Sequence, residues 1–210
     1  PNLQNHACII RTVKGGKWFR LHDKIHRPAN LAAAFKRVGA NKGSAGVDHV
    51  SVQTFGKNAE VELDKLHQAL RTRTYQPQAI RRVNIPKPGK RETRPLGVPT
   101  VRDRVVQTAV RQGIEPIFDH SFADCSYGFR PGLGCKDALR EMDRLLKEGY
   151  REVVEVDIQK FFDTLDHEIL MERVMEKIAD GQVLSLITDM LKQGVLEQGK
   201  QWTPEECTPQ

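Results

Sequence analysis

An aspartate follows a short run of β-branched residues in the second half of the chain. Residues 153–157 read Val-Val-Glu-Val-Asp, and Phe161 and Phe162 follow shortly afterwards. Runs of this composition favour a buried strand. A carboxylate at the end of such a strand is costly to desolvate unless a cation or strong hydrogen-bond donors meet it. A divalent metal ion is one candidate for that cation, and the alternative is that Asp157 caps a turn or pairs with an arginine.

The positive charge of the chain is concentrated in its middle third. The 210 residues carry a net charge of +6, but residues 71–111 hold 11 Lys and Arg against 2 Asp and Glu, whereas residues 112–210 hold 11 against 20. Such a basic block is the electrostatic footprint of nucleic-acid or polyphosphate binding, since each neutralised phosphate releases condensed counterions. The alternative is a solvated basic face.

The composition indicates a globular protein. Hydrophobic residues make up 39% of the sequence, and no run of about 18 apolar residues or secretory signal predicts a membrane segment or export. His22 and His26 lie four residues apart, but no third ligand accompanies them in a recognisable zinc motif. The cysteines are too scattered for a zinc knuckle and too few for a disulfide scaffold: they are Cys8, Cys125, Cys135 and Cys207. We therefore predict a cytoplasmic protein with reduced thiols.

Hydrophobic spacing and capping residues predict six helices between loops and strands. Their expected ranges are about 28–38, 58–71, 100–114, 135–147, 166–178 and 182–192. Glu115-Pro116 is expected to end the third helix, and Asp166 to cap the fifth. The glycine-rich stretch Gly39–Asp48 predicts a loop whose backbone can approach something closely. This loop either cradles a phosphate or merely turns the chain. The mixture indicates an α+β fold, not a regular β-α-β alternation.

Residues 78–100 predict a β-hairpin. The stretch 80–85 alternates like a strand, residues 86–93 supply turn residues, and residues 94–99 return. Its prolines predict an edge position or an exposed ribbon. Because side chains two apart share one face of a strand, cations along this ribbon can converge on a triphosphate. The cations are Arg81, Arg82, Lys87, Lys90, Arg91 and Arg94.

Several segments occur in an order that resembles the reverse transcriptase blocks of group II intron-encoded proteins (reverse transcriptase/maturases). The segments are Asn41–Asp48, Ile85–Lys90 with Arg94–Thr100 and Asp103–Gln107, Ser126–Gly132, Val156–Asp163 with Asp166-His167, and Thr208–Gln210. The resemblance covers residues from about 40 to 210. It implies an α+β right-hand polymerase fold, of which this chain holds the fingers and the first part of the palm. The implied division is an RNA-contacting extension over 1–40, fingers with the basic hairpin over 41–148, and the incomplete palm with returning fingers helices over 149–210.

The resemblance also implies a set of site residues. Asp157 matches the first catalytic carboxylate of a two-metal Mg²⁺ site, where the backbone carbonyl of Ile158 would complete the coordination. Phe162 matches the aromatic that lies under the incoming sugar and rejects a 2′-hydroxyl, although core packing is the alternative and is expected for Phe161. Arg81, Lys87 and Arg94 match the cations that grip the triphosphate, and Gln210 matches the glutamine that lines the nucleotide pocket.

Other residues are expected to play lesser parts. Tyr127–Arg130 is expected near the templating base, where an aromatic and an arginine can stack or hold phosphate. Arg82, Lys90 and Arg91 would contact template or intron RNA, or remain solvated. Asp163 and Asp166 would serve turns and helix caps.

One block of the family pattern is absent from this sequence. The Tyr-x-Asp-Asp block carries the other catalytic carboxylate, so we expect these 210 residues to be a fragment that is inactive alone. The expected whole is an RNA-directed DNA polymerase of a group II intron that also assists splicing. Its expected partners are structured intron RNA, an RNA template with a DNA primer and dNTP, with a dimer left open. The alternatives are a non-catalytic RNA-binding splicing module and a related bacterial defence or diversity-generating reverse transcriptase.

Overall fold

The computed structural model describes residues 13–14, 16–86, 89, 93–159, 161–197 and 200–202. Two compact units divide the chain: unit 1 comprises Pro1–Ile114 and Lys160–Gln210, and unit 2 comprises Glu115–Gln159. Among the described residues, no helix is long and apolar enough to cross a membrane.

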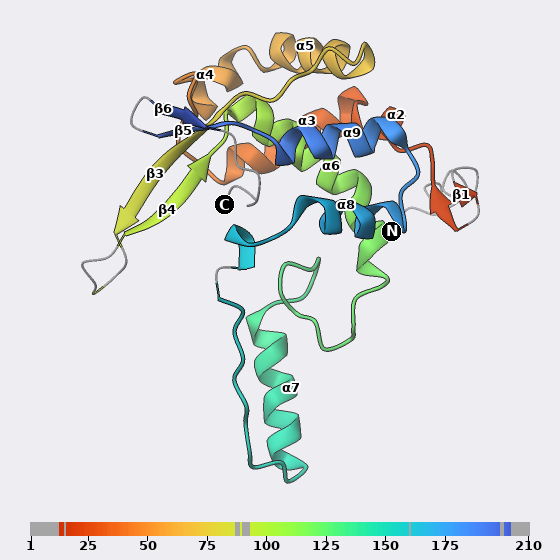
Figure 1. The fold of residues 1–210 in the computed structure, drawn as a ribbon, viewed down its shortest axis with the longest axis vertical. Helices are drawn as coiled ribbons and strands as arrows, with labels where there is room; N and C mark the ends of the chain where they lie inside the picture. The colour runs from red at the N-terminus through yellow and green to blue at the C-terminus, as the bar shows by residue number, and fades with distance from the viewer. Residues whose placement is uncertain are drawn as a thin grey trace. The chain divides into compact units, whose positions relative to one another are not determined.

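Unit 1 combines helices with a small mixed sheet (Figure 1). Its strands are β1 (Val13–Lys14), β2 (Lys17–Trp18), β3 (Ile80–Pro86), β4 (Thr93–Val98), β5 (Val195–Glu197) and β6 (Lys200–Trp202). Its helices are α2 (His22–Ile25), α3 (Pro28–Ala40), α4 (Val52–Lys57), α5 (Ala59–Arg71), α8 (His167–Met175) and α9 (Gly181–Leu191), with the 3-10 turn η1 (Phe161–Asp163). Helix α6 (Val101–Asp119) begins in unit 1 and ends in unit 2.

The predicted hairpin is confirmed. β3 and β4 pair antiparallel from Arg81 opposite Val98 to Pro86 opposite Thr93. The four-stranded sheet has the order β4-β3-β5-β6, in which β3 and β5 run parallel (Figure 1). β4 is thus an edge strand among the described strands, as its proline at position 95 predicts, since proline donates no ladder hydrogen bond.

The core of unit 1 lies along one face of α6. Val101, Val105 and Val106 are fully buried, and their spacing of four and five residues keeps them on one helical face. Two close approaches fix neighbouring helices against α6. A Cβ added to Gly113 would lie 2.9 Å from Ile25 Cγ1 of α2, and the Asn30 side-chain amide of α3 donates to the Ala109 carbonyl at 3.2 Å.

Asp180 joins two helices through their first turns. One carboxylate oxygen accepts from the backbone N–H of Leu21 (2.8 Å) and His22 (3.0 Å) at the start of α2. The other accepts from the backbone N–H of Gln182 (3.1 Å) and Val183 (3.3 Å) in α9. Four orphan helix donors are therefore satisfied by one buried side chain. α2 and the start of α9 consequently lie side by side (Figure 1).

The predicted helices are largely confirmed, with three differences. The four-residue helix α2 is absent from the sequence-based prediction. α6 continues through Pro116 to Asp119 and does not end at Glu115. A proline costs a helix the hydrogen bond to the carbonyl four residues earlier, but it sits here in the last turn, where little helix follows. The short helix α4, whose N-cap Ser51 accepts from the Thr54 N–H at 3.0 Å, is absent from the sequence-based prediction.

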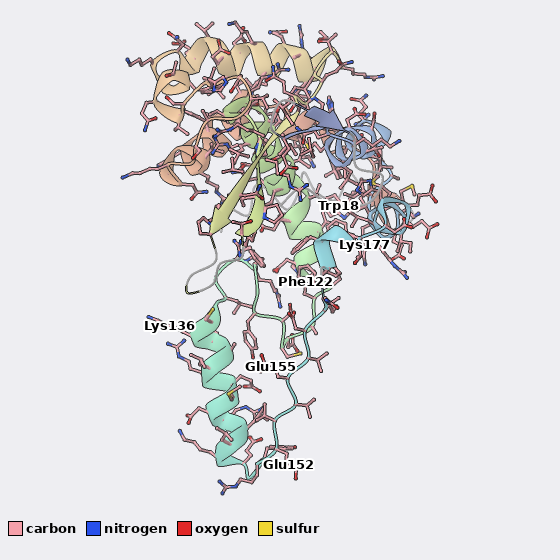
Figure 2. All side chains as sticks on the ribbon, turned by 60° about the vertical axis from the view of Figure 1, so that its left-hand side comes forward. Trp18, Phe122, Lys136, Glu152, Glu155 and Lys177 are labelled. Carbon is pink, nitrogen blue, oxygen red and sulfur yellow. The ribbon has the colours of Figure 1, made fainter. Side chains whose placement is uncertain are left out.

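Unit 2 consists of the end of α6, a loop, helix α7 (Cys135–Lys147) and an extended segment that returns beside α7. Figure 2 shows Glu152 and Glu155 on this returning segment and Lys136 on α7. No residue of α7 is buried, and Leu139 is 62% exposed. α7 is supported by ion pairs along its own surface, among them those of Arg144 with Glu141 and Glu148.

The predicted strand over Val153–Asp157 is wrong in this structure. Residues 150–158 adopt no strand, and Val153, Val154 and Val156 are 70%, 87% and 84% exposed. A strand needs a neighbour to take its backbone N–H and C=O groups, and none of the six described strands pairs with this segment. The β propensity of valine reports packing on a sheet, so without a partner strand it does not fix the conformation.

Candidate functional site

Asp157 lies in unit 2, on the exposed segment that follows α7. Between described residues, its carboxylate forms no ion pair and no hydrogen bond, so the alternative of an arginine partner or a capped turn is not observed there. The carboxylate is open to solvent together with Glu155 and Glu152. These three acids against Arg151 give the segment a local excess of negative charge, which favours a cation.

The oxygen ligands at Asp157 are of the type that Mg²⁺ prefers, but they are too few to hold the ion alone. A carboxylate oxygen and the neighbouring Ile158 carbonyl are hard oxygen ligands, which Mg²⁺ prefers. Within the described part of the chain, no group of three or more His, Cys, Asp or Glu side chains could hold a metal ion. Among the described residues, Asp157 therefore belongs to no such group.

Phe161 and Phe162 begin η1 in unit 1. Their rings meet edge to face with centroids 5.2 Å apart, a favourable geometry for an aromatic pair. Both side chains are 43% exposed. Core packing of Phe161, expected from the sequence, is therefore wrong, while the role of Phe162 beneath a sugar stays a prediction.

Arg81 contacts the Gly39–Asp48 loop through its guanidinium group. Its guanidinium donates to the Ala45 carbonyl at 2.7 Å, and Arg104 likewise donates to the Ser44 carbonyl at 2.6 Å. The same loop packs tightly, since a Cβ added to Gly46 would lie 2.6 Å from Thr100 Cα. The close approach predicted for the Gly39–Asp48 loop is confirmed, and its partner is protein backbone and guanidinium.

Both guanidinium groups keep unused donor capacity. The Nε atoms of Arg81 and Arg104 are buried without a hydrogen-bond partner, and burial lowers the pKa of Arg104 although Asp48 opposes that shift. The Arg81 side chain thus reaches the loop through Nη2, while its buried Nε has no hydrogen-bond partner.

The hairpin register places Arg81 and Arg94 on one face. Arg81 lies opposite Val98, and Arg94 lies opposite Ile85; residues 81 and 85 share a face because strand side chains alternate. The two arginines are about 13 Å apart along the ribbon, four residues at about 3.3 Å each. Arg81 and Arg94 therefore lie on the same face of the hairpin, one near each end of it.

On the opposite face of the sheet, side chains of β3 meet Glu197 of β5, the strand that pairs with β3. Arg82 lies 3.6 Å from the Glu197 carboxylate, and the Asn84 side chain donates to the same carboxylate at 3.3 Å. Glu197 therefore partly neutralises that face. Arg82 is engaged within the fold, where the sequence predicted an RNA contact or a solvated cation.

Two predicted nucleotide contacts, Lys87 and Gln210, lie outside the described residues, as do Lys90 and Arg91. Asp157 and Ile158 belong to unit 2, whereas Arg81, Arg94 and Phe162 belong to unit 1. The convergence of the carboxylate with the cations therefore stays a prediction.

Arg130 organises the loop of unit 2. Its Nε donates to the Asp119 carboxylate at 2.8 Å, and its Nη1 donates to the carbonyls of Ala123 and Ser126 at 3.0 and 3.1 Å. The guanidinium also lies 5.6 Å from the centroid of the Phe122 ring. These contacts use most of the arginine's donors within the unit, so its predicted phosphate contact would require them to open.

Phe129 is the exposed aromatic of the same loop. Its side chain is 94% exposed, and its φ is +57°, a left-handed conformation that costs a bulky residue about 1–2 kcal/mol. The loop thus presents a large aromatic ring to solvent at some conformational cost. This feature agrees with the predicted position of Tyr127–Arg130 near a templating base, which stays a prediction.

Two buried aspartates support the elements around the site and were missed or misassigned from the sequence. Asp103, fully buried, accepts from the Tyr75 hydroxyl at 2.7 Å and from the Gln78 N–H at 3.1 Å. Burial and the Asp103 charge raise the pKa of Tyr75 above its usual range. Thr100 caps α6 by accepting from the Asp103 N–H at 3.1 Å, and the Asp103 side chain turns to the segment that leads into β3. The other buried aspartate is Asp180, whose partners are distant in sequence.

The predicted cap at Asp166 is confirmed. Its carboxylate accepts from the backbone N–H of Glu168 (2.7 Å) and Ile169 (3.1 Å). Asp166 thus serves the start of α8.

Comparison with known proteins matches the same segments. Residues 85–210 match the family described as reverse transcriptase (RNA-dependent DNA polymerase). The chain is 37% identical over 191 residues to the group II intron-encoded protein LtrA of Lactococcus lactis subsp. cremoris, an alignment that covers 91% of this chain and 32% of LtrA. It is 36% identical over 197 residues to protein YkfC of Escherichia coli (strain K12), covering 91% and 51%.

The fold is also similar to that of a solved structure. A chain of the partial Cas6-RT-Cas1–Cas2 complex superposes with a TM-score of 0.59 at 22% identity, covering 90% of this chain and 31% of that chain. The resemblance predicted from the order of the motifs is confirmed by these matches. The chain spans about a third of the length of LtrA and about half that of YkfC.

Proposed function

The chain belongs to the reverse transcriptase (RNA-dependent DNA polymerase) family, and on that premise we propose that the whole protein copies RNA into DNA, with Asp157 as a catalytic carboxylate. The observation that carries the proposal is the family match over residues 85–210, which includes Asp157, Ile158 and Phe162. The exposure of the Asp157 carboxylate supports it, since a metal ion and the substrate must be able to reach its oxygens.

The family uses divalent metal ions, and we take the ion to be Mg²⁺. Asp157 and the Ile158 carbonyl would hold it, together with carboxylates from beyond this sequence. A bound pair of ions would activate the primer 3′-hydroxyl and stabilise the charge that develops at the phosphate. The chain's own part is to present a carboxylate at a position that solvent and substrate can reach.

The remaining site residues would bind and select the nucleotide. Arg81, Lys87 and Arg94 would neutralise the triphosphate of the incoming dNTP. Phe162 would lie under the sugar and exclude a 2′-hydroxyl, and Gln210 would line the nucleotide pocket. The shared face of Arg81 and Arg94 on the hairpin supports this arrangement.

The proposed partners follow from the relatives. The protein would bind structured intron RNA and assist its splicing, and it would use an RNA template with a DNA primer. The similarity to group II intron-encoded LtrA supports the intron, and the basic block over residues 71–111 supports binding of a polyanion. A cytoplasmic location and a possible dimer complete the proposal.

Primer extension by the chain continued through its downstream palm residues tests the polymerase function. Asp157→Asn is expected to lower magnesium-dependent dNTP incorporation at least about 1000-fold, because a loss of about 4 kcal/mol of transition-state stabilisation corresponds to that factor. Glu155→Gln is the matched control, since it removes an exposed charge two residues away. Equal losses in both variants, or full activity in Asp157→Asn, would contradict the proposal.

The 210-residue chain provides a second test. One carboxylate cannot position two metal ions, so this chain is expected to show no primer extension under conditions where the continued chain is active. Measurable extension by the short chain would contradict the assignment of the missing carboxylate to downstream residues.

A further inference from the structure

A cleft in unit 1 lies where the start of α2, the end of α5 and the start of α9 meet. It consists of two adjoining hollows of about 550 Å³ and 460 Å³, both lined by Phe19, His22, Arg73, Asp180 and Gln182. Volumes of this size are typical of small-ligand sites. None of these residues belongs to the polymerase site proposed above.

Three arginines from two distant segments surround the cleft. Arg71 is the last residue of α5, Arg73 follows two residues later, and Arg20 comes from the segment before α2. Within the described part of the chain, neither Arg20 nor Arg71 forms an ion pair. Since guanidinium groups suit phosphate in geometry as well as charge, their gathering favours an anion.

The acids of the cleft offset part of this charge. Asp180 keeps its negative charge, but both of its oxygens already accept from four backbone N–H groups. Asp23 faces Arg27 at 3.6 Å, and Asp189 is the other acid that lines the larger hollow. The three arginines therefore supply the cationic donors that an anion in the cleft would need.

Gln182 orients Arg73 toward the cleft. In the amide orientation that satisfies both neighbours, Gln182 Nε2 donates to His22 Nδ1 at 2.7 Å, and its Oε1 accepts from Arg73 Nε at 3.2 Å and also from Nη2. Burial and the nearby His26 lower the pKa of His22, which leaves its Nδ1 able to accept at neutral pH. Arg73 itself adopts a left-handed φ of +61°, which costs about 1–2 kcal/mol.

An aromatic ring completes the lining. Phe19 borders both hollows and is 37% exposed. An exposed ring beside arginines is the combination that stacks a nucleobase while its phosphate is held. Inorganic phosphate alone would leave Phe19 and most of the volume unused.

We propose that this cleft binds one nucleotide unit, with its phosphate on Arg71 and Arg73 and its base against Phe19. The unit is either a free mononucleotide or one nucleotide of a single-stranded RNA. Binding requires no polymerisation, so the test uses the 210-residue chain and its failure leaves the proposed reverse transcriptase activity untouched.

Calorimetric titration with AMP, adenosine and inorganic phosphate tests the free nucleotide, and fluorescence anisotropy with a short single-stranded RNA tests the strand. The double substitution Arg71→Gln with Arg73→Gln is expected to weaken AMP or RNA binding at least about tenfold, equivalent to about 1.4 kcal/mol. The matched control is Lys36→Gln with Arg37→Gln, which removes two exposed charges from α3. The control is expected to weaken binding less than about twofold.

Two further variants distinguish the loss of arginine charge from a folding defect and from the loss of the base contact. Thermal unfolding shows whether Arg73→Gln impairs folding. Arg20→Gln with Arg71→Gln leaves the Gln182 contacts of Arg73 intact. This second pair is expected to weaken AMP or RNA binding as the first pair does. Phe19→Leu is expected to weaken AMP and RNA while leaving inorganic phosphate unchanged. Saturable AMP binding identifies a free nucleotide, and RNA binding alone identifies a strand.

Three outcomes overturn the proposal. The first is an equal loss in the α3 control, which indicates general attraction to the basic surface. The second is binding of AMP and RNA that no arginine pair alters. The third is no binding of AMP or RNA by the unsubstituted chain.

Discussion

Three aspartates illustrate how the environment of one residue type decides its use. Asp103 and Asp180 are buried and saturated by hydrogen bonds from the protein. Asp157 is exposed and has no such bonds between described residues. A buried carboxylate needs donors to offset its desolvation, so the first two stabilise the fold. The third is available to a ligand.

The hydrogen bond from the Tyr75 hydroxyl to Asp103 is expected to contribute strongly to the stability of unit 1. Tyr75→Phe removes the 2.7 Å bond to Asp103 and leaves a buried carboxylate short of one donor, which should lower the free energy of unfolding by about 1–3 kcal/mol. Chemical denaturation monitored by circular dichroism measures it. Tyr150→Phe, at a 64% exposed tyrosine, is the control, and an equal effect there would contradict the assignment.

The histidines of α2 are expected to make stability depend on pH. Burial, followed by the neighbouring His26, lowers the pKa of His22, and burial, followed by His67, lowers that of His26. The facing charges are Asp180, Asp23, Arg73 and Arg27. A folded pKa below 6.5 means that the unfolded chain binds more protons, so stability is complete above pH 6.5 and falls as pH drops toward the folded values.

Urea denaturation across the pH range below 7 measures this dependence. His22→Gln with His26→Gln is expected to flatten the fall in the free energy of unfolding on acidification. His120→Gln removes an exposed imidazole in unit 2 and should retain the slope. An unchanged slope in the double variant would contradict the linkage.

At the scale of elements, sequence patterns predicted the helices and the hairpin, whose formation depends on residues that are close together in the sequence. The α3 helix has proline in its first turn and apolar residues at helical spacing, and the hairpin has alternation around a proline- and glycine-containing turn. The strand over Val153–Asp157 failed because strand formation depends on a partner elsewhere in the chain. Asp180 was missed for a similar reason, since Leu21 lies 159 residues away and sequence spacing carries no sign of the contact.

The cap at Asp180 is expected to stabilise two helices together. Asp180→Ala leaves four backbone donors of α2 and α9 unsatisfied, which should cost about 1–4 kcal/mol if each cap contributes about 0.5–2 kcal/mol. Asp166→Ala removes the cap of α8 only and should cost about half as much. Thermal unfolding compares them, and an equal cost would indicate that Asp180 serves one helix.

For the whole molecule, the two units differ in how much they bury. Unit 1 joins early and late parts of the chain through the β3–β5 pairing, the Asp180 bonds and the backbone bonds between Trp18 and residues 177 and 179. Figure 2 shows Trp18 beside Lys177 at this junction. In unit 2, α7 and residues 150–159 bury no side chain. The motif order predicted a set of site residues, but whether Asp157 and the hairpin cations meet depends on two units that sequence patterns do not place.

Limited proteolysis with a glutamate-specific protease is expected to cut first at Glu152 and Glu155. Both lie on the exposed segment outside any described helix or strand, and such segments open at almost no cost. The two fragments should then remain associated, because the contacts that hold unit 1 together link residues before the cut to residues after it. Co-elution in size-exclusion chromatography, followed by separation in a denaturing gel, measures this.

Glu152→Gln with Glu155→Gln should slow the first cut, whereas Glu62→Gln within α5 should not. Fragments that separate without denaturant would show that the late strands and helices do not form one unit with the early ones.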